Sequence, residues 1–230
     1  MSTRPLLAEF LGTFFLCFAG IAAIVSTGAP VNSGAGLVGI ALAHGLALSI
    51  AVNAFGGISG AHFNPAVTLG FLSAGRIKLP SALSYIVSQL IGATVAAAAC
   101  LYIFPAEAVD GSKLGIPLPA SWATTGVVLA TEFILTYLLM TAIYGTAVDE
   151  RGRAVKIGGF GIGLTVAFDI LAAGQVTGAS MNPARSFGPA LMYGYWTWHW
   201  AYWIAPPLGA IVAALVYEHV LMEKTAGSRQ

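Results

Sequence analysis

Six long apolar stretches divide this chain, and each is close to the length that crosses a lipid bilayer. About 20 helical residues span a hydrocarbon core of about 30 Å. Charged residues make up 8% of the 230 positions, which is too few to cover a surface that faces water. The sequence therefore predicts an all-α membrane protein with six transmembrane helices, at 5–27, 36–55, 82–104, 123–146, 156–173 and 199–221.

The basic residues between these stretches are distributed unevenly. Six spans place both ends of the chain on one side of the membrane, and Lys113 is the only basic residue in the loops of the opposite side. Basic residues gather in cytoplasmic loops, so we expect both termini in the cytoplasm. We also expect the chain in the plasma (cell inner) membrane. The net charge of +1 gives no reason to expect a nucleic-acid partner. The basic residues of the predicted cytoplasmic side are Arg4, Arg76, Lys78, Arg151, Arg153, Lys156, Lys224 and Arg229.

The triplet Asn-Pro-Ala occurs twice in the sequence. The two copies consist of Asn64, Pro65 and Ala66, and of Asn182, Pro183 and Ala184. The surrounding sequence repeats in character: "HGLALSIA" from position 44 matches "IGLTVAFD" from 162, and "AEFLGTFFL" from 8 matches "TEFILTYLL" from 131. We therefore expect a single transmembrane domain over 1–230 that contains two repeats, at 5–105 and 123–221.

Each repeat contains three spans, so the second repeat must cross the membrane in the opposite sense to the first. Asn is a common residue before the start of a helix, and Pro fits the first helical turn. The segments 64–74 and 182–192 are too short to cross the membrane, so we expect two re-entrant half-helices in two inverted repeats. Irregular backbone at this depth is tolerated where protein or a water-filled cavity satisfies it, and sites in inverted repeats lie near the midplane.

This pattern resembles the aquaporins, members of the major intrinsic protein family, over nearly the whole chain. The resemblance implies a passive transmembrane channel that conducts water in single file and excludes protons and ions. It also implies a homotetramer in the lipid bilayer and no cofactor. The half-helix dipoles repel cations in such a pore. The side-chain amides of Asn64 and Asn182 donate to a water oxygen there and interrupt a proton wire.

The resemblance further implies an outer constriction formed by His44, Ile170, Ala179 and Arg185. Strict water channels have Phe, His, and Cys or Thr at the first three of these positions. The combination here is similar to that of the plant tonoplast intrinsic proteins, many of which pass ammonia, urea or hydrogen peroxide as well as water. We expect the same small neutral solutes here. His62 is expected in the cytoplasmic vestibule, either as part of the lining or as a pH-sensitive group.

A glycerol or small-polyol facilitator is the alternative reading of this resemblance. Those relatives carry Asp and Lys where this chain has Ser186 and Ala190, and they lack the aromatic pair that is Tyr202 and Trp203 here. All four positions favour the water-channel branch. Tyr202 and Trp203 also suit an aromatic belt at the membrane interface.

Three carboxyl groups lie within apolar stretches. Glu9 and Glu132 occupy matching repeat positions. In the family such glutamates accept backbone N–H groups of the re-entrant loops, and a proton-relay pair is the alternative. Asp169 has no counterpart in the first repeat. We expect it to hydrogen-bond to neighbouring helices, with a pore-facing cation site as the alternative.

The sequence contains no motif of an intramembrane enzyme. HExxH and GxSxG are absent, and facing spans carry no paired catalytic Asp. We therefore predict no catalytic residue and no metal site. Cys17 and Cys100 lie within apolar stretches, where buried free thiols are expected. The chain is predicted to be a channel and not an enzyme.

Overall fold

The computed structural model describes residues 3–28 and 36–222, and every regular element in these ranges is a helix. Six helices are long and apolar enough to cross a membrane. They are α1 (Thr3–Gly28), α2 (Gly36–Ser59), α4 (Leu79–Ile103), α6 (Thr125–Ile143), α8 (Gly158–Thr177) and α10 (Ala201–Val216). The shorter elements are α3 (Pro65–Ser73), α5 (Ala106–Ser112), η1 (Lys113–Gly115), η2 (Tyr144–Val148), α7 (Glu150–Arg153), α9 (Pro183–Tyr193) and η3 (Tyr217–Leu221).

The six predicted spans and the two short half-helices are confirmed, with differences at the ends. The helices α2 and α8 each continue four residues beyond their predicted ends, to Ser59 and Thr177. Polar and glycine residues lower the hydropathy of both extensions. The hydroxyl groups of Ser59 and Thr177 donate hydrogen bonds to the carboxylates of Glu9 and Glu132. These bonds stabilise polar helix ends inside the protein, which hydropathy alone does not predict.

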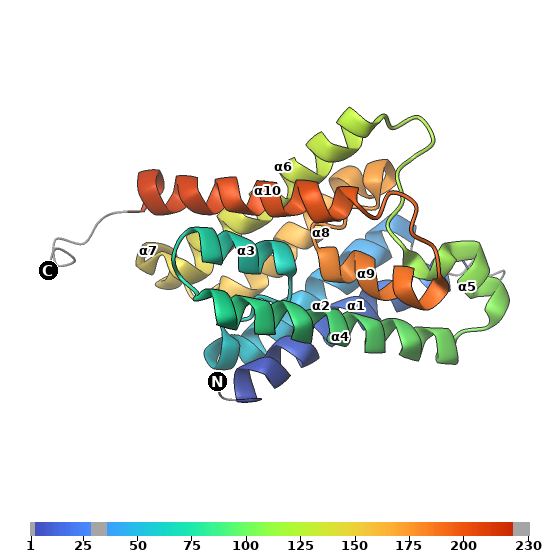
Figure 1. Ribbon diagram of the computed structural model, residues 1–230, viewed down its shortest axis with the longest axis horizontal. Coiled ribbons are helices and arrows are strands. Elements are labelled where there is room, and N and C mark those ends of the chain that lie inside the picture. Colours follow the sequence, from blue (N-terminus) through green and yellow to red (C-terminus); the bar gives the residue numbers. More distant parts are fainter. Residues whose placement is uncertain (1–2, 29–35, 223–230) are drawn as a thin grey trace, which may run out of the picture.

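The two half-helices pack against long helices of the opposite half of the chain. The helix α3 packs on α10, and α9 packs on α4, as Figure 1 shows. Among the long helices, α1 packs on α4 and α6 packs on α10, so the same pairing occurs in each half. At the centre, α2 packs on α8 and joins the two halves. Because each half-helix packs on a long helix of the opposite half, the starts of α3 and α9 meet in the interior.

The crossing of α2 and α8 depends on two glycines. A Cβ atom on Gly45 would lie 2.6 Å from the carbonyl oxygen of Gly163. A Cβ atom on Gly163 would collide with the Gly45 carbonyl oxygen and the Ser49 side chain. Small residues allow helices to approach closely in lipid, where packing rather than the hydrophobic effect drives association. The glycine pair therefore fixes the spacing of the two central helices.

Both described ends of the chain lie at one end of the helix bundle, opposite α5 (Figure 1). At that end Arg76, which follows α3, forms an ion pair with Glu218 in η3 at 2.5 Å. The Arg151 guanidinium hydrogen-bonds to Asp149, which lowers the pKa of that carboxyl to about 2, and also donates to the carbonyl of Leu221. The predicted cytoplasmic residues Lys224 and Arg229 lie outside the described residues. The basic loops after α3 and α6 thus gather around the end of the last helix.

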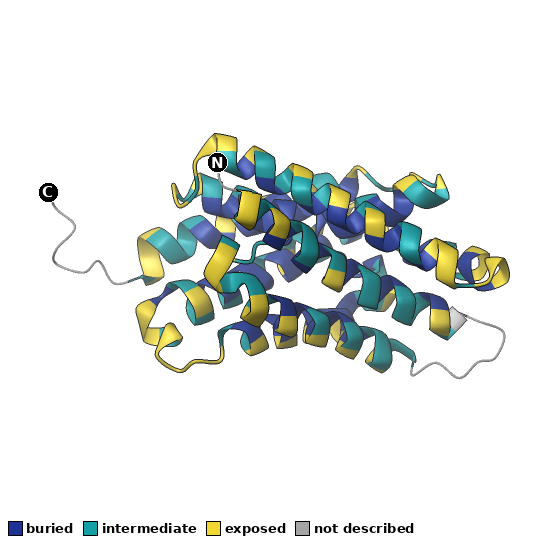
Figure 2. Cartoon of the chain, turned by 90° about the horizontal axis from the view of Figure 1, so that it is seen from below, coloured by how far each residue is buried: buried dark blue, intermediate teal, exposed yellow. Residues whose placement is uncertain are grey.

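Apolar side chains cover the outward faces of the long helices. Figure 2 shows that exposed and half-buried residues follow the outer faces while buried residues face inward. On α2, for example, Leu42, Leu46 and Ile50 are each about half exposed. A soluble protein rarely exposes such continuous apolar surface, whereas lipid solvates it. The chain is therefore an integral membrane protein.

A candidate pore through the helix bundle

Both half-helices begin with an asparagine cap followed by proline. The side-chain oxygen Oδ1 of Asn64 accepts the N–H of Ala66 at 2.8 Å. The Oδ1 of Asn182 accepts the N–H groups of Ala184 at 2.9 Å and Arg185 at 3.3 Å. Pro65 and Pro183 occupy the first turns of the two helices. A backbone N–H group at that position has no acceptor within the helix, so proline loses no hydrogen bond there. The Asn-Pro-Ala triplets therefore act as helix starts.

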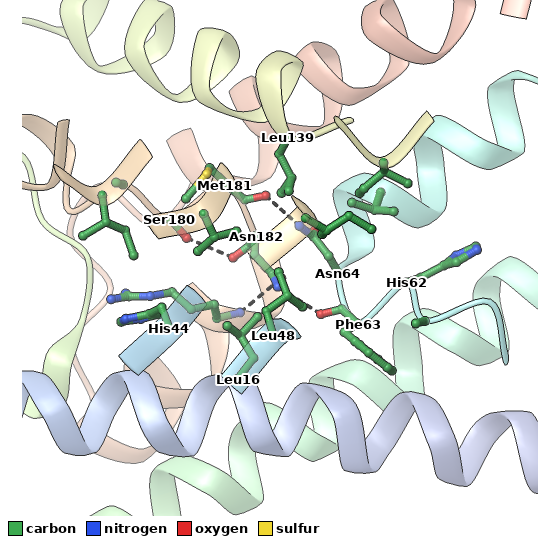
Figure 3. A pocket seen from close by; sticks show the side chains of 18 residues that line it. Leu16, His44, Leu48, His62, Phe63, Asn64, Leu139, Ser180, Met181 and Asn182 are labelled. Carbon is green, nitrogen blue, oxygen red and sulfur yellow. Dashed lines mark hydrogen bonds between the residues drawn. The ribbon is translucent and has the colours of Figure 1, made fainter. Parts of the chain in front are cut away.

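The two caps are also joined to each other across the midplane. The Nδ2 group of Asn64 donates to the carbonyl of Met181 at 2.8 Å, and that of Asn182 donates to the carbonyl of Phe63 at 3.0 Å (Figure 3). An amide NH₂ group has two hydrogens, so each asparagine keeps a second N–H after making its cross-bond. Both side chains line the central cavity. The cross-bonds fix where those remaining N–H groups lie.

The half-helices meet start to start. Their N-termini approach from opposite ends of the bundle, since α3 leads back to Arg76 at the end with η3, whereas α9 leads to Tyr193, which contacts Asp110 in α5. A helix N-terminus carries about half a positive elementary charge. Two such ends therefore create a positive potential at the centre of the protein, where salt screens charges less than at the surface.

Two buried glutamates hold the loops that precede the half-helices. The Glu9 carboxylate accepts the backbone N–H groups of His62 at 3.0 Å and Phe63 at 2.7 Å. The Glu132 carboxylate accepts those of Ser180 at 2.9 Å and Met181 at 2.8 Å. Both glutamates are fully buried. An unpaired backbone N–H group at this depth is costly, so each carboxylate stabilises the irregular backbone of one loop.

The same support recurs at two tyrosines in matching positions. The hydroxyl of Tyr85 donates to the carbonyl of Ser59 at 2.8 Å, and the hydroxyl of Tyr202 donates to the carbonyl of Thr177 at 2.6 Å. Tyr202 is almost fully buried, so here it holds a helix end and does not contribute to an interfacial belt. Trp203 is half-buried, and its indole N–H donates to His199 at 2.9 Å.

Three cavities follow one another through the protein and share residues where they meet. The central cavity and the one toward α5 share His44, Ile170 and Arg185. The central cavity and the one toward η3 share His62 and the isoleucines at 143 and 162. Between these ends the wall is mostly apolar, with polar groups at the two asparagines. The apolar wall residues include Leu16, Leu48, Val67, Leu139, Ile143 and Val166.

The four expected constriction residues line the central cavity, and all but Ala179 also line the cavity toward α5. His44, Ile170, Ala179 and Arg185 are each 2 or 3% exposed. The Arg185 guanidinium donates to the carbonyl of Gly115 in η1 at 3.0 Å. Sequence reasoning missed Gly115, because a backbone carbonyl in a loop has no side-chain signature. This contact fixes a buried positive charge beside the lumen.

The tautomer of His44 follows from its hydrogen bond. Its Nδ1 atom lies 2.8 Å from the carbonyl oxygen of Ile40. A carbonyl only accepts, so Nδ1 carries the proton and Nε2 of the neutral ring is an acceptor. The expected constriction would thus have Arg185 as its donor, beside the ring of His44. Ile170 and Ala179 complete it with an aliphatic face and a small side chain.

The remaining predicted site residues lie around the half-helices. His62 lines the pore toward η3, and its Nδ1 lies 3.1 Å from the Thr68 hydroxyl. In the second half, Ser180 replaces the histidine and lies 2.6 Å from the hydroxyl of Ser186. Ala190 is fully buried in α9, which packs on α4.

Both re-entrant loops have the same unusual backbone. Ala61 and Phe63 have φ angles of 55° and 50°, and Ala179 and Met181 have φ angles of 42° and 54°. Non-glycine residues rarely adopt positive φ, and such strain persists only where the surroundings impose it. The glutamate and asparagine bonds described above are those surroundings. No feature of the sequence predicts this conformation.

The expectation for Asp169 is wrong. Its side chain is fully buried, but neither carboxylate oxygen has a hydrogen-bond partner in the described ranges. Asp169 also lines none of the three pore cavities, so the alternative of a pore-facing cation site has no support. Cys17 and Cys100 are free and fully buried, as expected.

The position of Ala179 leads to a prediction about mercurials. Cys17 and Cys100 have no exposed surface, so water flux through the unmodified chain should resist mercurials. Ala179→Cys would place a thiol in the constriction, and a bound mercury atom would obstruct it. We expect at least a severalfold loss of water permeability, reversed by excess thiol, in stopped-flow measurements. Equal sensitivity of the two proteins would contradict the assigned place of Ala179.

Comparison with known proteins agrees with this geometry. The family model "Major intrinsic protein" matches residues 1–217. The chain is 41% identical to the Zea mays protein "Aquaporin TIP4-4", with 95% of this chain and 87% of that protein covered. It is 43% identical to the Arabidopsis thaliana protein "Aquaporin NIP1-1", with 94% and 73% covered.

Among solved structures, the X-ray structure of the aquaglyceroporin from Plasmodium falciparum superposes with a TM-score of 0.85 at 26% identity. The superposition covers 95% of this chain and 96% of that one. The fold is therefore shared with a channel of known structure. Six membrane helices, two half-helices that meet at the centre and a family match over nearly the whole length lead to one conclusion: the chain belongs to the major intrinsic protein family, the aquaporins.

Proposed function

We propose that this chain is a passive channel that conducts water in single file between His44 and His62 and excludes protons and ions. The observation that carries the proposal is the pair of cross-bonded asparagines, which line a mostly apolar cavity and each keep one N–H beyond the cross-bond. A water molecule that accepts from both asparagines has its lone pairs occupied, so it cannot accept a proton from its neighbour. The positive half-helix ends add an electrostatic barrier to any cation.

The outer constriction supports a wider range of neutral solutes. Ile170 and Ala179 leave more room than a histidine and a threonine would, and the Arg185 guanidinium offers N–H donors to a small polar molecule. We propose ammonia, urea and hydrogen peroxide as further solutes. A glycerol facilitator stays the alternative, and Ser186, Ala190, Tyr202 and Trp203 favour the water-channel branch over it.

The larger organisation is also a proposal. The exchange of half-helices between α4 and α10 supports a single channel domain of two inverted repeats, 5–105 and 123–221. The family supports a homotetramer, and the exposed apolar faces offer surface for subunit contacts as well as for lipid. The clustered basic loops support cytoplasmic termini. The plasma membrane stays a prediction from the sequence, and the TIP-type relatives favour a vacuolar membrane instead.

Stopped-flow light scattering on proteoliposomes tests the function. Under a sucrose gradient we expect shrinkage well above the rate of empty liposomes, and under urea or ammonium gradients we expect re-swelling faster than in empty liposomes. Glycerol should enter more slowly than urea. Shrinkage at the lipid rate would refute the water channel. Absence of urea and ammonia entry would refute only the proposed solute range.

A further inference from the structure

The middle of α1 contains a buried glycine that the proposed mechanism does not use. Gly20 lies well inside a 26-residue helix, where glycine is less favourable than alanine. A glycine in a helix interior usually has a packing reason. The helix α1 packs along both α2 and α4, so the question is which neighbour needs the missing side chain.

The neighbour of Gly20 is the imidazole ring of His44. A Cβ atom built on Gly20 would lie 2.5 Å from both Cδ2 and Cε1 of the ring, and closer still to Nε2. Side-chain atoms do not approach so closely, so the ring occupies the space that any other residue at position 20 would fill. The edge of the ring that carries the acceptor Nε2 therefore rests directly on the α1 backbone.

The ring has little freedom to retreat from that contact. Its Nδ1 atom is bonded to the carbonyl of Ile40 on its own helix, and α2 is fixed against α8 where Gly45 meets Gly163. The open side of the ring is the lumen, which His44 lines together with Arg185. A side chain at position 20 would therefore push the ring toward the opening.

The second half of the chain has no such arrangement. By the offset that pairs Glu9 with Glu132, Gly20 corresponds to Ile143. By the offset that pairs Asn64 with Asn182, His44 corresponds to Ile162. Both isoleucines line the central cavity toward η3. The pairing of Gly20 with His44 therefore has no counterpart at the matching positions of the second repeat.

We infer that Gly20, which has no side chain to contact a solute, is a positioning residue that sets the width of the outer constriction by seating the His44 ring. This inference rests on the proposed channel function. It assigns part of the solute specificity to a helix that contributes none of the four constriction side chains.

The test is a double-mutant cycle in proteoliposomes, with permeability normalised to reconstituted protein. Gly20→Ala should lower water permeability on the order of tenfold, which corresponds to about 1.4 kcal/mol of added barrier at the narrowed constriction, and should lower urea permeability by a larger factor. His44→Ala should raise urea permeability. In Gly20→Ala/His44→Ala the alanine at position 20 should have no further effect, since the ring it displaces is gone. Gly57→Ala, where a Cβ atom meets nothing within 4 Å, is the matched control and should behave as the wild type.

An unchanged Gly20→Ala channel would overturn the inference. An equal loss of permeability from Gly20→Ala in the presence and in the absence of His44→Ala would also overturn it, and so would failure of both Gly20 variants to fold. Each result would show that position 20 acts on the helix and not on the ring. If Gly20→Ala alone fails to fold and the double variant conducts water, the contact between position 20 and the His44 ring is supported. Absence of water flux in the wild type would refute the channel function itself, so the two failures are distinguishable.

Discussion

Replacing Arg185 with alanine should turn the water channel into a leak for protons and other cations. Arg185 is fully buried beside the lumen. A unit charge acts on a cation 4 Å away with about 4 kcal/mol at an effective dielectric constant of about 20. Loss of that repulsion corresponds to about a thousandfold in rate. Proton flux into dye-loaded proteoliposomes under a pH gradient measures the effect.

Arg185→Lys is the matched control for this experiment. The lysine keeps the positive charge but loses the planar fork that bonds to the Gly115 carbonyl. It should keep most of the cation exclusion and change the passage of urea relative to water. Cation fluxes that stay at the wild-type level in Arg185→Ala would show that the half-helix ends alone form the barrier, and would contradict the role given to this side chain.

Replacing Glu132 with alanine should have a large effect on stability. Its carboxylate accepts three hydrogen bonds, from the Thr177 hydroxyl and from the N–H groups of Ser180 and Met181. Each donor left unpaired in the interior costs about 1–3 kcal/mol, so the total loss is about 3 kcal/mol or more. That is a large fraction of the roughly 5–15 kcal/mol by which domains are stable. We expect little monodisperse protein and a strongly lowered unfolding temperature in detergent.

Two milder variants make this prediction specific. Glu132→Gln keeps one acceptor oxygen and should be intermediate in stability. Thr177→Val removes one of the three donors and also the acceptor of the Ala179 N–H, so it should cost about 2 kcal/mol. Water permeability per folded molecule should change little in Thr177→Val. A Glu132→Ala protein as stable as the wild type would show that the loop does not depend on this carboxylate.

The membrane spans and the half-helices could be predicted because their physical causes are local. Hydropathy over about 20 residues marks a span, and Asn followed by Pro marks a helix start wherever it occurs. For the helices that end at Ser59 and Thr177, hydropathy predicts ends four residues too early. Their polar groups are satisfied by glutamates about 50 positions away, and a local average of hydropathy contains no such partner.

The parts of the pore that could not be predicted depend on contacts between distant backbone segments. The Gly115 carbonyl that holds Arg185 is 70 positions away in the chain. The positive φ angles of Phe63 and Met181 arise where the two loops meet, although neither residue type favours that conformation. At Asp169 the sequence predicts contacts that are not found. Its carboxylate suggested hydrogen bonds to neighbouring helices, and the described chain makes none.

The central claim is that two half-helix starts meet at Asn64 and Asn182 and let water pass without protons. Its most direct test is to record water and proton flux in the same proteoliposomes, loaded with a pH-sensitive dye and containing valinomycin and potassium to remove any membrane potential. We predict osmotic shrinkage well above that of empty liposomes, together with a proton flux equal to theirs. Proton flux that rises with the amount of reconstituted protein, or water flux at the lipid rate, would contradict the account.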